Sequence, residues 1–327
     1  MVNVLEKYSG KAKDVELLKE KEVKILFRDS ISAFDGVKTE ELSMKGQINC
    51  LTSKKLFEIL GHYGIETHYL KTIADNEMLC ERVKIIPVEI VCRNIAAGSF
   101  CRRYGVKNGM KFTKPLVEFF LKEDELHDPL ITEEAAVLMN LLSSEEAIIM
   151  KAVTLAVNHI LSAVFKLLSL ELIDFKLEFG KNLDGKLIIA DEISADTMRL
   201  WEINTGEIKD KDRYRKDLGD VILHYQDILK RLESLSEFPK LDLHTKMNIR
   251  IALKDSVLDP AGSVTLRSLQ RNGYENVVSV RMGKHALLEF SAVPSFSLLK
   301  TTKEVSSKIL SNPLIEQSEI TMNYNEA

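Results

Sequence analysis

Residues 175–191, with the sequence FKLEFGKNLDGKLIIAD, predict a β-hairpin. Apolar and polar side chains alternate over residues 175–180, which is the period of a strand with one apolar face. Residues 187–190 form a second apolar run, and an Asp184–Gly185 pair lies between the two runs. A pair of this kind is typical of a two-residue hairpin turn, so we expect two antiparallel strands.

The turn also predicts which side chains face each other. With Leu183 paired to Lys186, the register places Glu178 directly opposite Asp191. Cross-strand Cβ atoms lie roughly 5 Å apart, so the two carboxylates could share a hard cation such as Mg²⁺. Two alternatives stay open: both charges extend into water, or a loop one residue longer places them on opposite faces.

The composition predicts a soluble, two-domain protein. The chain has 327 residues, 45% of them apolar, and a net charge of −4, which gives no basic field for nucleic acid or an anionic membrane. Its four cysteines lack metal-binding spacing and the N-terminus lacks an apolar signal core, so we expect reduced thiols and a cytoplasmic location. The apolar segment 147–172 is interrupted by charged and polar residues, which favours a buried helix over a membrane span.

The first 235 residues predict a mixed α and β domain. Alternating patterns indicate strands at residues 23–28 and 88–93. A long helix is expected to begin at Ser143, with Glu146 completing a capping box, and a second helix is expected at 216–233.

A second domain is expected at residues 247–327, after a linker at 236–246. The predicted order of elements is βαββαβ, which is typical of a small ferredoxin-like sandwich. The expected elements are a strand from 247, a helix at 262–272, strands at 277–282 and 286–290, a helix at 300–310 and a strand at 316–322.

A glycine and two lysines near the N-terminus form a candidate phosphate-binding segment. In Gly10-Lys11-Ala12-Lys13, the glycine lets backbone N–H groups approach a phosphate and the lysines supply positive charge. The sequence is not a P-loop, so a plain basic turn is the alternative.

Residues 29–36, DSISAFDG, form a polar turn after a predicted strand. Such a turn can position substrate hydroxyls, with Asp35 as the candidate ligand, or it can be an ordinary polar turn.

A third candidate site begins at Arg93, where a strand delivers a guanidinium before the sequence NIAAGSF. Ser99 occupies a predicted helix N-cap, so it and Arg93 could converge on a phosphate or carboxylate. An ordinary strand-to-helix connection is the alternative.

Charged residues that follow the hairpin form a fourth candidate site. Asp196 and Arg199 are spaced as a local ion pair, or Arg199 binds a carboxylate while Asp196 accepts from sugar hydroxyls. Residues 211–215, KDRYR, add Arg215 to this set or form a solvated loop.

Together these segments closely resemble the SAICAR synthetase family, over about residues 1–235. The motifs are SGKAKD (9–14), DSISAFDG (29–36), VCRNIAAGSF (91–100), DFKLEFG (174–180), ADEISADTMRLW (190–201) and KDRYRKDLG (211–219). The resemblance implies a two-lobed ATP-binding α+β fold with antiparallel sheets.

The resemblance also implies an ATP- and Mg²⁺-dependent carbon–nitrogen ligase of purine biosynthesis. A ribonucleotide carboxylate would attack the γ-phosphate of ATP, and the amine of L-aspartate would then displace phosphate from the acyl phosphate. The implied roles are nucleotide binding by Gly10, Lys11, Ala12 and Lys13; metal binding and catalysis by Glu178 and Asp191; catalysis by Lys176 and Arg199; and substrate binding by Asp35, Arg93, Ser99, Asp196, Arg199 and Arg215.

One position departs from the pattern of the family. The usual proline between the serine and the aspartate is Ala195 here, which loosens the backbone before Asp196 without removing a reacting group. We therefore expect activity to survive.

Residues 247–327 resemble the PurS subunit of formylglycinamide ribonucleotide amidotransferase. The matching segments are VLDPAG (257–262), VRMGK (280–284) and LSNPLIE (310–316), with Ala261 in place of a common glutamine. The resemblance implies an assembly module that bridges glutaminase and synthetase subunits and self-associates, so a homo-oligomer is expected. A catalytically inert scaffold and a small-molecule kinase are the alternative functions of the whole chain.

Overall fold

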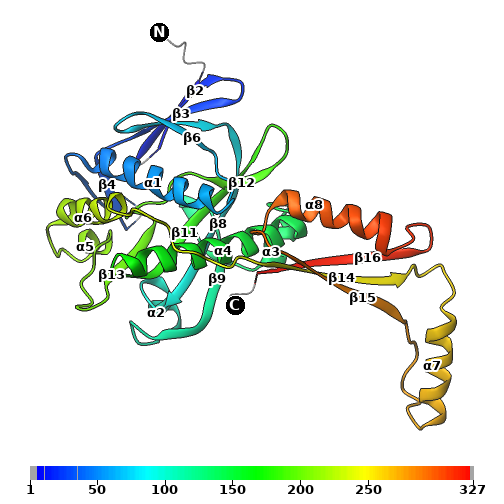
Figure 1. Ribbon diagram of the computed structural model, residues 1–327. Coiled ribbons are helices and arrows are strands. Elements are labelled where there is room, and N and C mark those ends of the chain that lie inside the picture. The colour runs from blue at the N-terminus through cyan, green and yellow to red at the C-terminus, as the bar shows by residue number, and fades with distance from the viewer. Residues whose placement is uncertain (1–5, 11, 35, 325–327) are drawn as a thin grey trace. The chain divides into compact units, whose positions relative to one another are not determined.

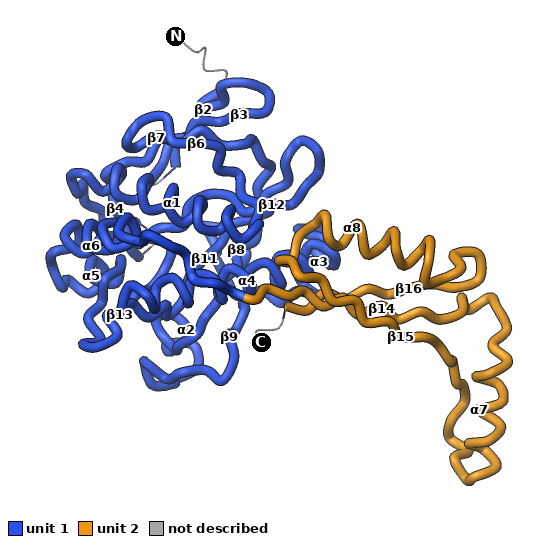
Figure 2. Tube along the Cα trace, in the orientation of Figure 1, with its two compact units in different colours: residues 1–241 blue, residues 242–327 orange. Residues whose placement is uncertain are grey.

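The computed structural model describes residues 6–10, 12–34 and 36–324, so the predictions made at Lys11 and Asp35 lie outside the described residues. The chain divides into two compact units, residues 1–241 and 242–327 (Figure 2). The division falls inside the stretch expected as a linker, 236–246.

One antiparallel sheet of the first unit has the strand order β1-β2-β3-β7-β6 (Figure 1). The strand expected at 23–28 is β3, and its alternating pattern buries Ile25 and Phe27 on one face. The strands are β1 (Glu6–Ser9), β2 (Lys13–Lys19), β3 (Glu22–Phe27), β6 (Tyr69–Ala74) and β7 (Glu77–Glu81).

A second antiparallel sheet has the order β10-β9-β8-β11-β12, and β13 also pairs with β11. The strand expected at 88–93 lies within β8. The strands are β8 (Val83–Ile95), β9 (Lys111–Leu121), β10 (Leu130–Ile131), β11 (Leu170–Asn182), β12 (Leu187–Ala190) and β13 (Met198–Glu202).

Smaller elements complete the first unit. Strands β4 (Ser30–Ala33) and β5 (Lys38–Glu41) form a separate ribbon. The helices are α1 (Lys45–His62), α2 (Ser99–Tyr104), α3 (Glu133–Leu138), α4 (Ser144–Leu167), α5 (Asp212–Arg215) and α6 (Val221–Glu233), with a 3₁₀ turn at Asp124–Leu126.

Helix α4 is the core helix of the second sheet, as its sequence predicts. The expected capping box is present: Ser143 accepts a hydrogen bond from the N–H of Glu146, and the Glu146 side chain accepts from the N–H of Ser143. By length and composition α4 could span a membrane, but 67% of its most apolar window is buried in the unit. Asn158 on α4 hydrogen-bonds Asn94 on β8, which places the helix against one face of this sheet.

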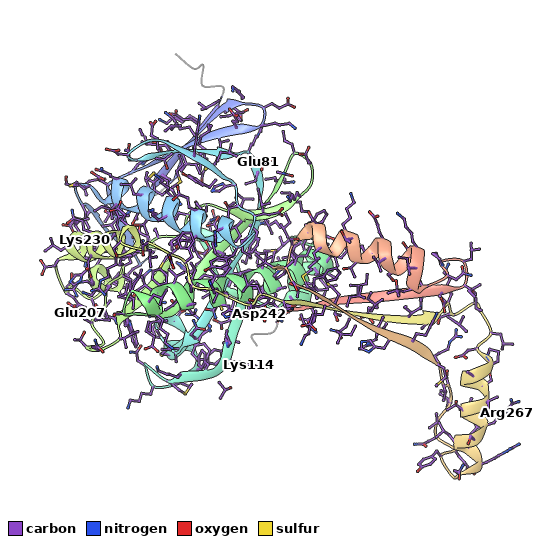
Figure 3. The ribbon with its side chains drawn as sticks, viewed as in Figure 1. Glu81, Lys114, Glu207, Lys230, Asp242 and Arg267 are labelled. Atoms are coloured by element: carbon purple, nitrogen blue, oxygen red, sulfur yellow. The ribbon has the colours of Figure 1, made fainter. Side chains whose placement is uncertain are left out.

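The hairpin is present, but its predicted register is wrong. Glu178 pairs with Ala190, so Asp191 is not its cross-strand partner. The N–H of Asn182 bonds the carbonyl of Lys186, so the loop contains three residues, 183–185, rather than the two expected. The Asn182 side chain stabilises this loop: its oxygen accepts from the N–H of Lys186, and its amide donates to Glu81, which Figure 3 labels.

The helix expected at 216–233 is shorter than predicted. The chain instead forms α5, leaves the helical conformation and begins α6 at Val221. Asp217, Gly219 and Asp220 have φ values of 53°, 71° and 53°, and such left-handed residues interrupt a right-handed helix.

The second unit contains an antiparallel sheet of order β15-β14-β16. Its elements alternate along the chain as strand, helix, strand, helix, strand. They are β14 (Thr245–Leu253), α7 (Pro260–Arg271), β15 (Gly283–Phe290), α8 (Phe296–Val305) with a π-helical turn at Ser306–Leu310, and β16 (Glu316–Tyr324).

The strand expected at 277–282 does not form. The N–H of Met282 instead bonds the Asp259 side chain, and Arg281 donates to the carbonyls of Val257 and Lys254. These bonds attach the segment to the loop that precedes α7 rather than to the sheet. Arg267 on α7 extends into solvent (Figure 3).

Candidate functional site

One face of the second sheet carries a row of charged side chains. Strands β8 and β11 pair so that Glu178 lies opposite Glu89, and Asp174 lies opposite Arg93. Because alternate residues of a strand share a face, Lys176 lies on the same face between Asp174 and Glu178. The apolar residues between them form the opposite face, toward α4. The acidic partner of Glu178 across the sheet is therefore Glu89, which the sequence analysis did not select.

At the Glu178 end, acids and lysines alternate in what we call the lysine–carboxylate cluster. Lys176 Nζ lies 2.7 Å from Glu89 Oε1 and 3.5 Å from Glu178 Oε1. Lys122, which follows β9, pairs with Glu178 and lies 3.5 Å from Glu89. The members of the cluster are Lys13, Glu89, Lys122, Lys176, Glu178, Asp191 and Glu192.

Lys13 brings the N-terminal segment to this cluster. Its ammonium pairs with Asp191 and lies 2.8 Å from Glu192 Oε1. The segment turns tightly, since the N–H of Gly10 bonds the carbonyl of Lys13 at 2.8 Å. The carbonyl of Ala12 accepts from the N–H of Arg28 at 2.9 Å, which ties the turn to the end of β3.

The two acids predicted to bind metal have different electrostatic environments. Burial and the neighbouring Asp191 raise the pKa of Glu178. Burial would also raise the pKa of Asp191, but the positive charges of Lys13 and Lys176 hold it below its usual range. Glu178 and Asp191 therefore repel each other, although they are not cross-strand partners.

Backbone geometry explains how Asp191 reaches the cluster after β12 ends. Asp191 has a φ of 64°, in the left-handed region that aspartate tolerates better than most residues. The Nε2 atom of His68 lies 2.9 Å from the carbonyl oxygen of Asp191, and since a carbonyl only accepts, this nitrogen is the donor. Burial lowers the pKa of His68 to about 4.

The donor set fits Mg²⁺ only together with a phosphate. Within the described ranges, no group of three or more His, Cys, Asp or Glu side chains could hold a metal ion. Glu178 and Asp191 are oxygen donors whose mutual repulsion a divalent cation would relieve. Two carboxylates suffice for Mg²⁺, which takes its remaining ligands from water and substrate phosphates.

At the other end of the charged face, Asp174 joins two arginines. Arg93 donates to Asp174 at 2.7 Å and to Glu118 at 2.6 Å, and both pairs are buried. Its second terminal nitrogen lies 3.3 Å from the hydroxyl of Ser99, which is the first residue of α2 rather than its N-cap. Arg199 donates to the same Asp174 at 2.8 and 3.0 Å.

Arg199 also lies against the backbone of Gly98. Gly98 has a φ of 55°, and a Cβ atom there would come within 2.4 Å of the Arg199 Nη2 atom, so a larger residue would have to displace the guanidinium. Asp212 receives a hydrogen bond from Arg199 at 3.1 Å and one from Arg215 at 2.6 Å. We call Arg93, Ser99, Asp174, Arg199, Asp212 and Arg215 the arginine cluster.

The Asp196 carboxylate binds two side chains of the protein. One carboxylate oxygen lies 2.8 Å from Lys45 Nζ, and the other accepts from the Tyr225 hydroxyl at 2.7 Å. Burial would raise its pKa, but Lys211 and Lys45 hold it below the usual range. The carbonyl of Ala195 accepts from the N–H of Lys211, so the backbone before Asp196 is held without the proline of the family pattern.

Several charged residues of the site escaped the sequence analysis. Glu89 lies on a strand predicted from its alternation, and Asp174 lies in a quoted motif, so both could have been selected as charges on the polar face of a strand. Lys122 and Glu118 offered no such signal, because their partners come from strands far away in the sequence.

Comparisons with known proteins match the two parts of the chain to two families. The SAICAR synthetase family model matches residues 6–232, and residues 246–324 match PurS, described as phosphoribosylformylglycinamidine (FGAM) synthase. The phosphoribosylaminoimidazole-succinocarboxamide synthase of Methanocaldococcus jannaschii is 46% identical over 225 residues, which cover 69% of this chain and 93% of that protein.

Solved structures give the same result. The phosphoribosylaminoimidazole-succinocarboxamide synthase from Ehrlichia chaffeensis has a TM-score of 0.68 and 40% identity, covering 71% of this chain and 100% of that one. A SAICAR synthetase solved in complex with ADP has a TM-score of 0.68 and 37% identity, covering 72% of this chain and 100% of that one.

By fold and by sequence the protein is a ligase. The chain belongs to the SAICAR synthetase family, and its residues 246–324 form a PurS-like domain. The predicted family and α+β fold class are confirmed, with one strand fewer in the described part of the second unit than expected.

Proposed function

We propose that the first unit joins L-aspartate to the carboxylate of 5-amino-1-(5-phosphoribosyl)imidazole-4-carboxylate in a reaction driven by ATP, as part of purine biosynthesis. The supporting observation is the charged face of the second sheet, which carries two distinct clusters. Asp174 in one and Glu178 in the other lie four residues apart on β11, or about 13 Å. The two clusters thus lie side by side on one face of the sheet, and we place one substrate at each.

We place the nucleotide phosphates at the lysine–carboxylate cluster. Lys13 and Lys176 would then exchange part of their contact with acids for contact with phosphate oxygens, and Gly10 and Ala12 would hold the turn that carries Lys13. Glu178 and Asp191 are the residues that would hold Mg²⁺. The bound ion would neutralise negative charge on the phosphates.

We place the ribonucleotide at the arginine cluster. Ser99 and Arg199 would bind its phosphate and carboxylate, while Arg93 holds Ser99 in position. Arg215 and the loop of Asp35 are further proposed contacts. Asp196 would act through Lys45 and Tyr225, which connect its loop to α1 and α6.

A carboxylate has no good leaving group, so it must be phosphorylated before an amine can form an amide with it. A carboxylate oxygen of the ribonucleotide attacks the γ-phosphorus, and the bond from that phosphorus to ADP breaks. The amine of aspartate then attacks the acyl carbon, phosphate departs and the amine loses a proton. The chain contributes mainly positioning and charge neutralisation, which account for most of the catalysis of phosphoryl transfer by proteins.

A separate role is proposed for the PurS-like domain. The match of residues 246–324 to PurS supports an assembly function, in which this domain binds the glutaminase and synthetase subunits of formylglycinamidine ribonucleotide synthase and associates with a second copy of the chain. We propose the cytoplasm as the location, since the cysteines in the described part of the chain are free thiols.

The test is a product assay with ATP, Mg²⁺, the carboxylated ribonucleotide and aspartate. ADP release that requires every component and yields an amide supports the ligase. A stable phosphorylated product would indicate a kinase instead. No turnover by a folded chain that still captures amidotransferase subunits would indicate an inert scaffold.

A further inference from the structure

A short segment before β6 is attached to the end of β12. The N–H of Ile189 bonds the carbonyl of Glu66 at 3.1 Å, and the N–H of His68 bonds the carbonyl of Ile189 at 2.8 Å. The imidazole of His68 then donates to the carbonyl of Asp191 at 2.9 Å. Residues 66–68 thus hold Ile189 in β12 through their backbone, and hold Asp191, which follows β12, through the His68 side chain.

The hydrogen bond from His68 to Asp191 lies where the backbone conformation is strained. Asp191 adopts a φ of 64°, which costs a non-glycine residue roughly 1–2 kcal/mol. This conformation turns the chain out of β12 and brings the Asp191 carboxylate to Lys13. A donor on the Asp191 carbonyl stabilises the turn by satisfying an oxygen that the strand pairing no longer uses.

We propose that His68 is a positioning residue for the nucleotide end of the site: by hydrogen-bonding the Asp191 carbonyl, it fixes the left-handed turn that aims the Asp191 carboxylate toward Lys13 and Glu178. The inference rests on the proposed function, because it assigns the Asp191 carboxylate to a divalent cation and nucleotide phosphates.

A purely structural role for His68 makes a different prediction. His68 is 2% exposed, and its ring packs edge-on against Phe57, with ring centroids 5.7 Å apart. If the ring only filled the core, loss of packing on either partner would lower stability without a specific effect on cation binding. Phe57→Leu is the matched control, since it disturbs the same contact and leaves the hydrogen bond to Asp191 in place.

The experiment measures binding of Mn²⁺, as a probe for Mg²⁺, in the presence of saturating ADP. Electron paramagnetic resonance measures the concentration of free Mn²⁺ in solutions of the full chain. We expect His68→Phe, which keeps a ring but has no donor, to weaken Mn²⁺ binding about tenfold, as loss of a ligand-orienting hydrogen bond does at metal sites. His68→Gln, which can still donate, should stay within about threefold of the unsubstituted protein.

Kinetics supply a second readout. The Mg²⁺ concentration for half-maximal turnover should rise in His68→Phe by a similar factor, while the KM for the ribonucleotide stays unchanged. Phe57→Leu should bind Mn²⁺ normally. If His68→Phe does not fold, His68→Asn, whose amide is too short to reach the carbonyl, carries the same expectation.

Normal Mn²⁺ affinity in His68→Phe, or an equal loss in Phe57→Leu, would overturn the inference. Asp191→Asn separates this failure from failure of the proposed function. If Asp191→Asn binds Mn²⁺ normally, the assignment of Asp191 to the cation is wrong. If Asp191→Asn loses binding and His68→Phe does not, only the role of His68 is wrong.

Discussion

At the scale of single residues, the site depends on acids and bases whose charges are balanced by direct neighbours. Glu178 is buried beside other acids, and its pKa is raised, while Asp191 is held ionised by Lys13 and Lys176. Each acid is paired with a lysine. Arrival of a triphosphate with its cation would therefore exchange partners among charges that are already in place, rather than bury new ones.

We predict that Glu178→Gln and Asp191→Asn each lower kcat by at least about 100-fold, because each removes charge from the proposed cation site and little volume. Asparagine also tolerates the left-handed conformation of residue 191, so the fold should persist. The measurement is steady-state turnover at saturating and at limiting Mg²⁺. Asp184→Asn, in the exposed turn of the same hairpin, is the control and should be near normal. Near-normal turnover of either site variant at limiting Mg²⁺ would contradict the assignment.

Asp210 predicts a measurable pH dependence of stability. It is fully buried and accepts hydrogen bonds from the N–H groups of Leu200 and Asp212. Burial, and next the charge of Asp212, raise its pKa to about 7, while Arg199 opposes the shift. Because the pKa is about 7 in the folded chain and near 3.8 in the unfolded chain, protonation of Asp210 stabilises the fold fully below pH 3.8. This contribution decreases as the pH rises and is lost above about pH 7.

Asparagine does not titrate, so only the unsubstituted chain loses this contribution. Between pH 5 and pH 8 we therefore expect its free energy of unfolding to fall by about 2–3 kcal/mol relative to that of Asp210→Asn. Urea denaturation of the first unit, followed at both pH values, measures it. A difference that does not change with pH would show that Asp210 is ionised throughout this range.

At the scale of elements, β11 organises the site. Its apolar residues pack toward α4, and its charged residues Asp174, Lys176 and Glu178 belong to both clusters. The neighbouring strand β8 adds Glu89 and Arg93 at matching positions. The connection from β8 to α2 then returns Gly98 and Ser99 to the arginine cluster, where the backbone passes so close to Arg199 that a side chain would collide with it.

We predict that Gly98→Ala lowers kcat/KM for the ribonucleotide by about 100-fold, because displacing Arg199 by about 1 Å misplaces its guanidinium. Gly105→Ala is a control for a positive φ in the αL region: φ is 64° at the end of α2, and a Cβ atom there would meet no heavy atom within 4 Å. It should cost roughly 1–2 kcal/mol in stability and leave the kinetic constants unchanged. Equal loss of activity in both variants would contradict the role of the Arg199 contact.

At the scale of the whole molecule, two units with different family matches share one chain. The described residues of the lysine–carboxylate and arginine clusters all come from the first unit. The linker begins on that unit, where Phe238 packs on His62 and the carbonyl of Pro239 accepts from the Tyr63 hydroxyl at 2.5 Å. We therefore expect ligase chemistry to need no residue from the PurS-like domain.

We predict that a chain ending at residue 241 keeps its ligase turnover within about twofold, because the first unit is compact by itself and domains with their own cores can fold alone. The same truncation should abolish capture of amidotransferase subunits, which the full chain is expected to bind at micromolar concentrations. Pull-down with both chains, beside the product assay, measures the two properties. Loss of turnover on truncation would show that the second unit supports catalysis, and equal capture by both chains would exclude an assembly role.

Much of the molecule follows from local sequence. The capping box at Ser143 and Glu146, the apolar face of α4 and the alternation in β3, β8 and β11 predict their elements correctly, because these patterns depend on neighbours three or four residues away or on the two-residue period of a strand. The motifs that carry the family resemblance are also continuous in sequence.

Only the tertiary structure decided which charges meet. Whether Glu178 pairs with Asp191 or with Ala190 on β12 depends on a loop one residue longer, and a register shift of one residue reverses every side chain. Its other neighbour, Glu89, comes from β8, which is far away in the chain. The approach of Lys13 to Asp191 and of Gly98 to Arg199 likewise joins segments separated by about a hundred residues or more. Local propensities do not encode such contacts, because they arise when whole elements pack.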